Sequence, residues 1–460
     1  MDEHTCTTFL AGKKATIDGS TIVSRVEDYS NNFNPQKFVV ITPDKQPRIY
    51  KSKTTAFEIK LPDNPLRYTS TPDANSDAGI FGASGINSEN VSMTATETIT
   101  TNPRILSLDP LNDKDGMGEE DFLTIVLPYV RSAREAVERV GKLLTEYGTY
   151  ESNGMAFGDH DELWYLETIG GHHWAAVRIP DEAYIIAPNR FNITEFDFNS
   201  DSTMCSADLK DLIDENNLNP DMIGYNLRRI FGSSTYRDAH YNNPRAWYIQ
   251  QMLSGSNEKS PTDQDLPFIN YPKHKITIQE VKQVMSAHYQ DTPFDPYAGK
   301  EAPYRSIALN RNLELHVLQI RNDVNNEISG IHWLAYGPNV VNALVPFYAN
   351  VIDTPKTYRD TETSFNIHDI YWLNHVIMGM ADPDFQQVEP KIEDFEEKVM
   401  AKILNIQHQA DAKIAELAQD DISSYLTEIN EQMAEVSYKG SLNLLGQLVD
   451  YRFKHARLQY

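Results

Sequence analysis

The sequence has few cysteines, no long apolar run and fewer basic than acidic side chains. Only Cys6 and Cys205 occur in 460 residues, so a framework of several disulfides is excluded. No segment approaches the roughly 20 consecutive apolar residues that a membrane-spanning helix needs. The first residues have neither the basic nor the apolar part of a secretory signal. We therefore expect a cytoplasmic protein that does not associate with membranes.

The shortage of basic side chains bears on possible partners. Asp and Glu number 66 against 41 Lys and Arg, which gives a formal net charge of −25. Such a surface repels the phosphates of nucleic acids and of anionic membranes, so we expect neither as a partner. Apolar residues still make up 40% of the chain, which is enough for a large core.

The pattern of residue types predicts strands, then helices, then strands, then helices. Residues 6–11 and 21–25 are rich in strand-forming types and flank the turn signal Asp18-Gly19-Ser20, which predicts a hairpin. Apolar residues at three- and four-residue steps predict helices. The expected helices cover 121–147, 209–213 and 246–253, and the further strands cover 38–42, 55–61, 80–86, 91–98, 155–157, 163–168, 173–179, 184–187, 306–308, 313–320, 332–336 and 342–347.

The last seventy residues differ in pattern from the rest of the chain. Apolar residues recur between 395 and 436 with charged residues between them, which predicts one long amphipathic helix or a pair of helices. These helices would pack on the body of the protein or on another subunit, as in a homo-oligomer. The order of elements lacks strict strand–helix alternation, so we expect an α+β fold with antiparallel sheets covered by helices.

Cys6 is the strongest candidate for a catalytic residue. An isolated cysteine is more often a small buried apolar residue than a nucleophile. Here, however, Cys6 opens the first predicted strand, and Arg25 and Asp28 end the returning strand. A nearby guanidinium lowers the pKa of a thiol. If Cys6 became N-terminal, its α-amine, with a reference pKa of about 7.7–8.0, could carry the proton. Asp28 could hold that amine in place.

These residues resemble the N-terminal block of a known family. The segments Cys6-Thr-Thr-Phe, Ala15-Thr-Ile-Asp-Gly-Ser and Arg25-Val-Glu-Asp are similar to those of bacterial N-terminal-nucleophile cysteine dipeptidases of the dipeptidase A type. That family is related to secernins and, more distantly, to bile-salt hydrolases and penicillin V acylases. The resemblance continues through Gly85-Ile-Asn-Ser-Glu-Asn, Ala187-Pro-Asn-Arg, Tyr236-Arg, Pro244-Arg-Ala-Trp-Tyr and His332-Trp-Leu-Ala-Tyr-Gly-Pro.

The resemblance implies a fold and a processing step. The fold is a four-layer αββα sandwich of antiparallel sheets, here in residues 6–385, followed by a helical C-terminal region in 386–460. Residues 1–5 form a short propeptide, which is removed by cleavage of the bond between Thr5 and Cys6. No metal and no organic cofactor is implied.

The resemblance also implies further site residues. Asn189 assists catalysis, and a helix-start arginine falls on Arg245 or, alternatively, on Arg237. Asn87 and Glu97 are expected in substrate binding. Glu97 occupies the position where acylases carry an asparagine of the oxyanion hole, and an ionised carboxylate cannot donate to an oxyanion. We therefore expect Glu97 to bind the α-ammonium group of a dipeptide.

The expected function is hydrolysis of dipeptides through a Cys6 thioester. Two alternatives stay open at this point. The first is an N-acyl amide hydrolase of the bile-salt or penicillin V type, which would use the same machinery on another substrate. The second is a non-catalytic, secernin-like binding protein with the same sandwich.

Overall fold

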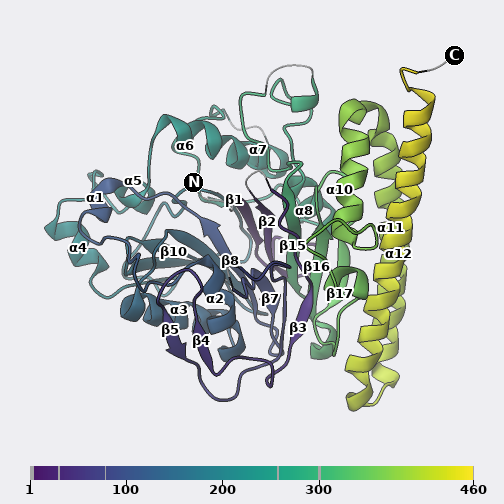
Figure 1. Ribbon diagram of the computed structural model, residues 1–460. Coiled ribbons are helices and arrows are strands. Elements are labelled where there is room, and N and C mark those ends of the chain that lie inside the picture. Colours follow the sequence, from purple (N-terminus) through teal and green to yellow (C-terminus); the bar gives the residue numbers. More distant parts are fainter. Residues whose placement is uncertain (1–4, 30–31, 78, 256–257, 299–301, 459–460) are drawn as a thin grey trace.

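Two stacked antiparallel sheets form the centre of the molecule, as a computed structural model of the protein shows (Figure 1). The structure describes residues 5–29, 32–77, 79–255, 258–298 and 302–458, without the side chains of residues 96 and 97. Within these ranges, no helix is both long enough and apolar enough to cross a membrane.

The first sheet has seven strands and contains the predicted N-terminal hairpin. Its order is β14-β12-β1-β2-β15-β16-β17. The turn before β2 begins at Asp18, whose Oδ1 accepts from the N–H of Ser20, and Gly19 has a φ of +74°, which favours glycine. The strands are β1 (Thr5–Ala11), β2 (Thr21–Asp28), β12 (Tyr184–Pro188), β14 (Ile269–Asn270), β15 (Asn312–Ile320), β16 (Gly330–Tyr336) and β17 (Val345–Tyr348).

The second sheet has six strands in the order β13-β11-β10-β9-β8-β7. Its strands are β7 (Ser84–Ile86), β8 (Ser92–Thr98), β9 (Asn153–Gly158), β10 (Leu163–Ile169), β11 (His173–Ile179) and β13 (Thr203–Cys205). There are also two small two-stranded sheets, one of β3 (Val39–Ile41) with β6 (Tyr68–Ser70), the other of β4 (Ile49–Lys51) with β5 (Glu58–Lys60). β8 lies against β1 and β2, so the two large sheets meet beside the hairpin.

Helices cover the outer faces of the sheets. On the second sheet lie α2 (Glu119–Val126) and α3 (Ala133–Tyr147), and α7 (Asn243–Ser254) packs on β12. The other helices outside the C-terminal region are α1 (Pro103–Leu106), α4 (Leu209–Glu215), α5 (Leu227–Phe231), α6 (Tyr236–Tyr241), α8 (Ile278–Met285), α9 (Lys356–Arg359) and α10 (Ile370–Ala381).

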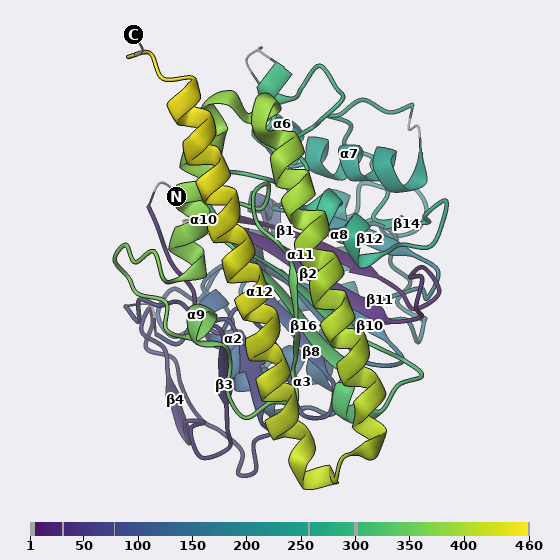
Figure 2. The same cartoon turned by 90° about the vertical axis from the view of Figure 1, so that its right-hand side faces the viewer.

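The C-terminal region is a pair of long helices. α11 (Phe385–Lys413) and α12 (Gln419–Lys454) run side by side across the edge of the first sheet, where they contact α10 and β17 (Figure 2). Buried apolar residues recur on their inner faces, among them Phe395, Ile403 and Leu426. The predictions of mixed helices and antiparallel sheets, and of a helical C-terminal region, are confirmed.

Two predicted elements differ from the structure. The helix expected over 121–147 is broken, because Pro128 ends α2 in a short 3₁₀ turn and Ser132 caps the start of α3 by accepting from the N–H of Glu135. The strand expected over 306–308 is a loop instead. There the N–H groups of Ile307 and Ala308 both donate to Ala287 O, so they pair with a loop rather than with a neighbouring strand.

Candidate active site

Cys6 lies at the start of β1, and the hairpin places two of its predicted partners beside it. Thr5 is opposite Asp28 in the register, and Cys6 is opposite Glu27. Arg25 Nη1 donates to Cys6 Sγ over 2.9 Å. The side chains of Cys6 and Arg25 are both fully buried. A thiol in contact with a buried guanidinium is a chemical setting that favours the thiolate.

The guanidinium of Arg25 is held in place by the second sheet as well as by its own. Its Nε donates to Thr94 Oγ1 over 2.8 Å, and its Nη2 donates to Ala95 O over 3.1 Å. Both acceptors belong to β8. The arginine therefore bridges the two sheets at the position of the sulfur atom.

Carboxylates surround this arginine. Glu27 lies 3.1 Å from Nη2, and Glu119 at the start of α2 lies 3.7 Å from Nη1. Burial alone would lower the pKa of Arg25, but the neighbouring acidic groups outweigh burial and raise it: Cys6, Glu27, Glu119 and Glu314. The guanidinium is consequently a permanent cation beside the thiol.

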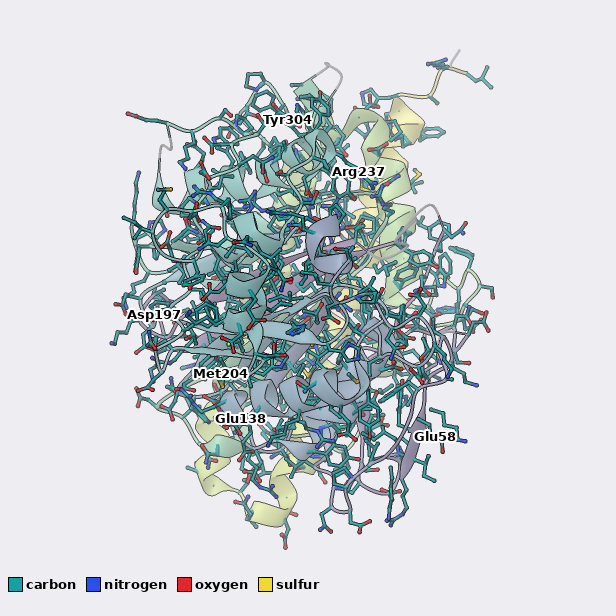
Figure 3. All side chains as sticks on the ribbon, turned by 90° about the vertical axis from the view of Figure 1, so that its left-hand side faces the viewer. Glu58, Glu138, Asp197, Met204, Arg237 and Tyr304 are labelled. Carbon is teal, nitrogen blue, oxygen red and sulfur yellow. The ribbon has the colours of Figure 1, made fainter. Side chains whose placement is uncertain are left out.

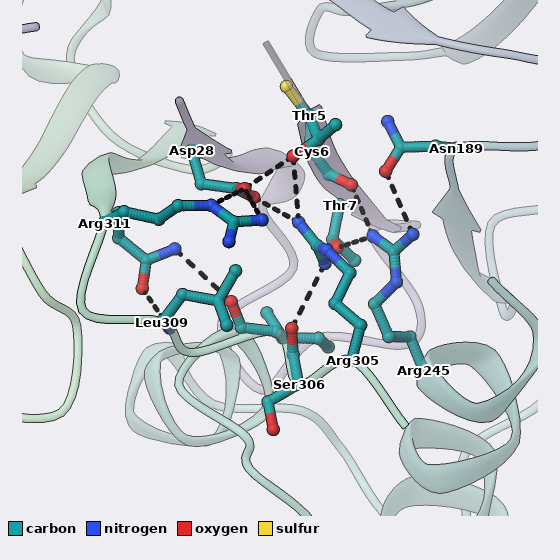
Figure 4. A network of polar contacts seen from close by, with 12 residues as sticks. Thr5, Cys6, Thr7, Asp28, Asn189, Arg245, Arg305, Ser306, Leu309 and Arg311 are labelled. Atoms are coloured by element: carbon teal, nitrogen blue, oxygen red, sulfur yellow. Dashed lines mark hydrogen bonds and ion pairs between the residues drawn. The ribbon is translucent and has the colours of Figure 1, made fainter. Parts of the chain in front are cut away.

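Asp28 lies on the opposite face of the hairpin from the sulfur atom, as the alternation of side chains along a strand requires. Thr5 Oγ1 donates to Asp28 Oδ1 over 2.5 Å. Arg305 pairs with the same carboxylate, and Arg311 Nη2 lies 3.2 Å from it (Figure 4). A buried carboxylate thus lies next to the bond between Thr5 and Cys6, where cleavage would create an amine.

Arg245 near the start of α7 reaches the backbone of Cys6. Its Nη1 donates to Cys6 O over 2.6 Å and to Thr7 Oγ1 over 2.7 Å (Figure 4). Its Nη2 and Nε donate to three further acceptors: Asn189 Oδ1, Asn242 Oδ1 and Tyr241 O. All five N–H groups of this arginine are used within the protein, so Arg245 positions Cys6 and Asn189 in the intact chain.

Arg237 occupies a different environment from Arg245. It is exposed on α6 (Figure 3), where its guanidinium lies 5.8 Å from the ring centre of Tyr241. Of the two arginines that the sequence left open, the structure brings Arg245 to Cys6.

Asn189 directly follows β12, is buried, and is joined to the backbone of Cys6 through Arg245. Its Oδ1 accepts from Arg245, and its Nδ2 donates to Thr98 O over 3.0 Å. Nδ2 carries a second hydrogen. Asn189 therefore joins the end of β12 to the end of β8 close to Cys6.

Asn87 and Glu97 are the two predicted substrate-binding residues. The side chain of Asn87 organises the turn between β7 and β8, because its Oδ1 accepts from the N–H groups of Glu89 and Val91. Its Nδ2 donates to two carbonyl groups that follow α2, those of Leu127 and Val130. The backbone of Glu97 pairs with Gly154 in β9 at a bulge in β8. The side chain of Glu97 lies outside the part of the chain that the structure describes.

Several residues near Cys6 were not predicted. Glu27 could have been found, since period-two alternation along β2 places it on the same face as Arg25. Arg305 carries no such signal, because it comes from a loop far along the chain and reaches Asp28 only through the fold.

Tyr241, the last residue of α6, also lies at this site. Its ring centre is 5.3 Å from the guanidinium of Arg245 and 5.1 Å from that of Arg305. Burial would raise the pKa of the Tyr241 phenol, but the two guanidinium groups lower it below its ordinary value. A phenol of increased acidity therefore lies between Arg245, which contacts Cys6, and Arg305, which pairs with Asp28.

Cys6 is closed to solvent, since it has no exposed surface. A cavity of about 950 Å³ opens beside α1 and α5, but its lining contains neither Cys6 nor Arg25. Among the described residues, no cluster of three or more His, Cys, Asp or Glu side chains could hold a metal ion.

Comparison with known proteins places this site in a family. The sequence profile of Peptidase family C69 matches residues 5–398. "Probable dipeptidase B" of Lactococcus lactis subsp. lactis is 51% identical over 464 residues, covering 99% of this chain and 97% of that protein. "Dipeptidase A" of Lactobacillus helveticus is 50% identical, covering 98% of this chain and 97% of that protein. "Probable dipeptidase" of Salmonella dublin is 33% identical, covering 75% of this chain and 80% of that protein. The predicted relationship is confirmed, and the chain belongs to Peptidase family C69.

Proposed function

We propose that this protein is a cysteine dipeptidase that hydrolyses dipeptides to free amino acids with Cys6 as its nucleophile. The observation that carries the proposal is the 2.9 Å contact between Arg25 Nη1 and Cys6 Sγ. Relatives that span almost the whole chain are named dipeptidases, which supports the same substrate class.

The reaction consists of two acyl transfers. The Cys6 thiolate attacks the peptide carbonyl, the C–N bond breaks, and the leaving amine takes the proton that the Cys6 α-amine received from the thiol. The first amino acid leaves and a thioester remains. The α-amine then takes a proton from water, hydroxide attacks the thioester, and the second amino acid leaves as the thiol is restored.

The neighbours of Cys6 have separate roles in this scheme. Arg25 stabilises the thiolate, and Asp28 holds the α-ammonium group after processing. The second hydrogen of Asn189 Nδ2 donates to the oxyanion, while Arg245 keeps Asn189 and the Cys6 carbonyl in position. Asn87 acts through the turn that it organises.

The proposal requires that the bond between Thr5 and Cys6 is cleaved. Residues 1–5 are the propeptide, residues 6–385 the hydrolase domain, and residues 386–460 the helical C-terminal region, through which the protein could form a homo-oligomer. Two stacked sheets with helices on both outer faces support an αββα sandwich of the N-terminal-nucleophile type. The full burial of Cys6 supports an inactive precursor.

The decisive test is the intact mass of the wild type and of Cys6→Ala, together with N-terminal sequencing. We expect the wild type to lose five residues and the variant to keep them. A wild type that retains residue 1 and hydrolyses no dipeptide would favour the non-catalytic alternative. Equal rates on dipeptides and on their N-acetylated forms would favour an N-acyl amide hydrolase.

Glu97 is proposed to bind the α-ammonium group of the substrate. The substitution Glu97→Gln keeps the size of the side chain and removes its charge. We expect KM for dipeptides to rise at least about tenfold, because a hydrogen bond to a charged group is worth roughly 1.5–3 kcal/mol. Processing of the precursor should slow much less. An equal loss of both would contradict this role.

A further inference from the structure

A chain of buried polar contacts leads from Arg25 into the middle of the first sheet. Arg25 Nε donates to Thr94 Oγ1 over 2.8 Å, and Thr94 Oγ1 lies 2.9 Å from His316 Nε2. His316 Nδ1 lies 2.6 Å from Glu314 Oε1. The side chains of Arg25, His316 and Glu314 have no exposed surface, and Thr94 is 1% exposed.

The protonation states of Glu314 and His316 depend on the burial of these two side chains. Burial raises the pKa of Glu314 well above its ordinary range, and the nearby Glu27 raises it further. Burial also lowers the pKa of His316. These shifts favour the neutral forms of both groups. In that state the carboxyl group of Glu314 donates to Nδ1, and His316 carries its proton on Nε2. Nε2 consequently donates to Thr94 Oγ1.

Thr94 Oγ1, on β8 of the second sheet, therefore accepts two N–H groups from neighbouring strands of the first sheet, one from Arg25 on β2 and one from His316 on β15. A hydroxyl oxygen has two lone pairs, one for each of these donors. His316 therefore fixes where Thr94 Oγ1 lies, and Oγ1 in turn fixes the direction in which Arg25 Nε points. Because the guanidinium is planar, fixing Nε also fixes Nη1, the atom that contacts Cys6 Sγ.

We propose that Thr94 and His316, held by Glu314, are positioning residues that keep the Arg25 guanidinium against the Cys6 thiolate. None of the three touches the sulfur atom; each acts through Arg25. The inference rests on the proposed role of Cys6 as the nucleophile. It extends the site from the hairpin to β8 and β15.

Other charged or titratable groups also face Arg25, and the variants used in a test must leave these groups unchanged. Glu27 belongs to β2 and Glu119 to α2. His332 on β16 lies behind His316, with 6.4 Å between the ring centres. His332 bonds to Thr69 and Ser84 instead of Thr94, and it is equally buried. It is therefore a matched control for His316.

The experiment measures the pH dependence of Cys6 alkylation in the mature protein. Iodoacetamide reacts with the thiolate, and mass spectrometry separates Cys6 from Cys205. Cys205 is an internal reference, because burial, with a contribution from Asp208, raises the pKa of its thiol to about 11. No substrate is needed, so the measurement is independent of whether dipeptides are the substrates.

His316→Met removes the donor to Thr94 while keeping an apolar side chain of similar size. We expect the midpoint for Cys6 alkylation to rise by about one pH unit, and kcat at pH 7 to fall about tenfold with little change in KM. His316→Gln places an amide donor near the position of Nε2 and should stay close to the wild type. His332→Met should leave the midpoint unchanged.

A second pair of variants changes Thr94, the residue that lies between His316 and Arg25. Thr94→Val removes the hydroxyl group, whereas Thr94→Ser keeps it, so only Thr94→Val should shift the midpoint upward. This pair decides the question if His316→Met does not fold. Equal midpoints for Thr94→Val and Thr94→Ser would overturn the proposal, as would an equal effect of His316→Met and His332→Met. If the midpoints shift as expected but the protein hydrolyses no dipeptide, only the proposed substrate is wrong.

Discussion

Two arginines approach Cys6 from opposite ends of the residue. Arg25 contacts the sulfur atom, and Arg245 contacts the carbonyl oxygen. The first contact changes the chemistry of the thiol, because a cation next to sulfur favours the thiolate. The second determines the direction of the strand end from which the thiol projects. The acidity and the orientation of the Cys6 thiol thus depend on different side chains and can be tested separately.

Arg245→Lys tests the positioning role. Lysine keeps the charge, but its single ammonium group cannot replace five N–H donors in a planar arrangement. We expect kcat/KM of the mature enzyme to fall on the order of 100-fold, which corresponds to about 2.7 kcal/mol of lost transition-state stabilisation. Arg237→Lys, at the exposed arginine of α6, is the matched control and should keep the activity of the wild type. Similar losses in both variants would contradict the assignment of Arg245.

Thr5→Val tests how the precursor is held for cleavage. The hydroxyl group of Thr5 donates to Asp28, so its loss frees the residue whose carbonyl Cys6 would attack in the proposed cleavage. We expect the release of residues 1–5, followed by intact mass over time, to slow about tenfold, the effect of one lost hydrogen bond to a charged group. Thr5→Ser should process at the normal rate. The mature enzyme from each variant has the same sequence, so an altered kcat/KM after processing would argue against this explanation.

At the residue scale, local sequence patterns predicted those site residues that the N-terminal hairpin brings together. Strand and turn signals place Cys6 beside Arg25 and Asp28, and the structure has them there. Arg305 and His316 depend on which distant strand or loop lies beside β1 and β2. No local pattern encodes that choice, because it is made by packing between elements far apart in the chain.

At the scale of elements, α12 closes an open sheet edge. β17 is the last strand of the first sheet, and an uncovered edge strand leaves N–H and C=O groups unpaired. The side-chain amide of Asn430 on α12 pairs with both the N–H and the C=O group of one residue of β17. Its Oδ1 accepts from Tyr348 N over 2.9 Å, and its Nδ2 donates to Tyr348 O over 3.0 Å. The C-terminal helices therefore complete the sheet as well as covering it.

Asn430→Ala should destabilise the protein by about 1–3 kcal/mol, because it leaves a buried N–H and a buried C=O without partners. The midpoint of urea unfolding, with the slope held constant, measures this loss. Asn443→Ala on the exposed face of the same helix is the control and should change the midpoint little. If Asn430→Ala matches Asn443→Ala, the edge of β17 is satisfied in another way.

The C-terminal helical pair was predictable because its apolar repeat is long and regular. The apolar periodicity of 121–147 was equally clear, but the structure has a break there. Pro128 and Ser132 interrupt the helix without interrupting the spacing of apolar residues. The loop at 306–308 has strand-like composition, but its N–H groups pair with Ala287 instead. Such choices depend on tertiary context, which outweighs local propensity.

At the scale of the whole molecule, Glu167 connects the two sheets behind the active site. It lies on β10 of the second sheet and accepts from the backbone N–H groups of Asn192 and Ile193, in the segment that follows β12 of the first sheet. The same segment begins with Asn189. Burial raises the pKa of Glu167 to about 7. The position of Asn189 is thus linked to a buried acid that titrates near neutral pH.

Glu167 should make the free energy of unfolding decrease as the pH rises through neutrality. The unfolded chain loses this proton near the ordinary value of 4.5, whereas the folded protein keeps it to about 7. Between these values the folded state binds more protons, so stability is highest at the acidic end of the window and falls toward pH 7. At about 1.4 kcal/mol for each unit of pKa difference, this contribution is roughly 3.5 kcal/mol.

Glu167→Gln removes the titrating group and should flatten the profile between pH 5 and pH 7.5, whatever constant change in stability it brings. Urea unfolding at several pH values measures the slope in both proteins. Burial and the neighbouring Glu120 raise the pKa of Asp121 to about 7 as well, but this group is present in both proteins and cancels in the comparison. Glu138→Gln, at an exposed carboxylate of α3 (Figure 3), should keep the slope of the wild type. A slope that Glu167→Gln leaves unchanged would mean that Glu167 is ionised in the folded protein throughout this range.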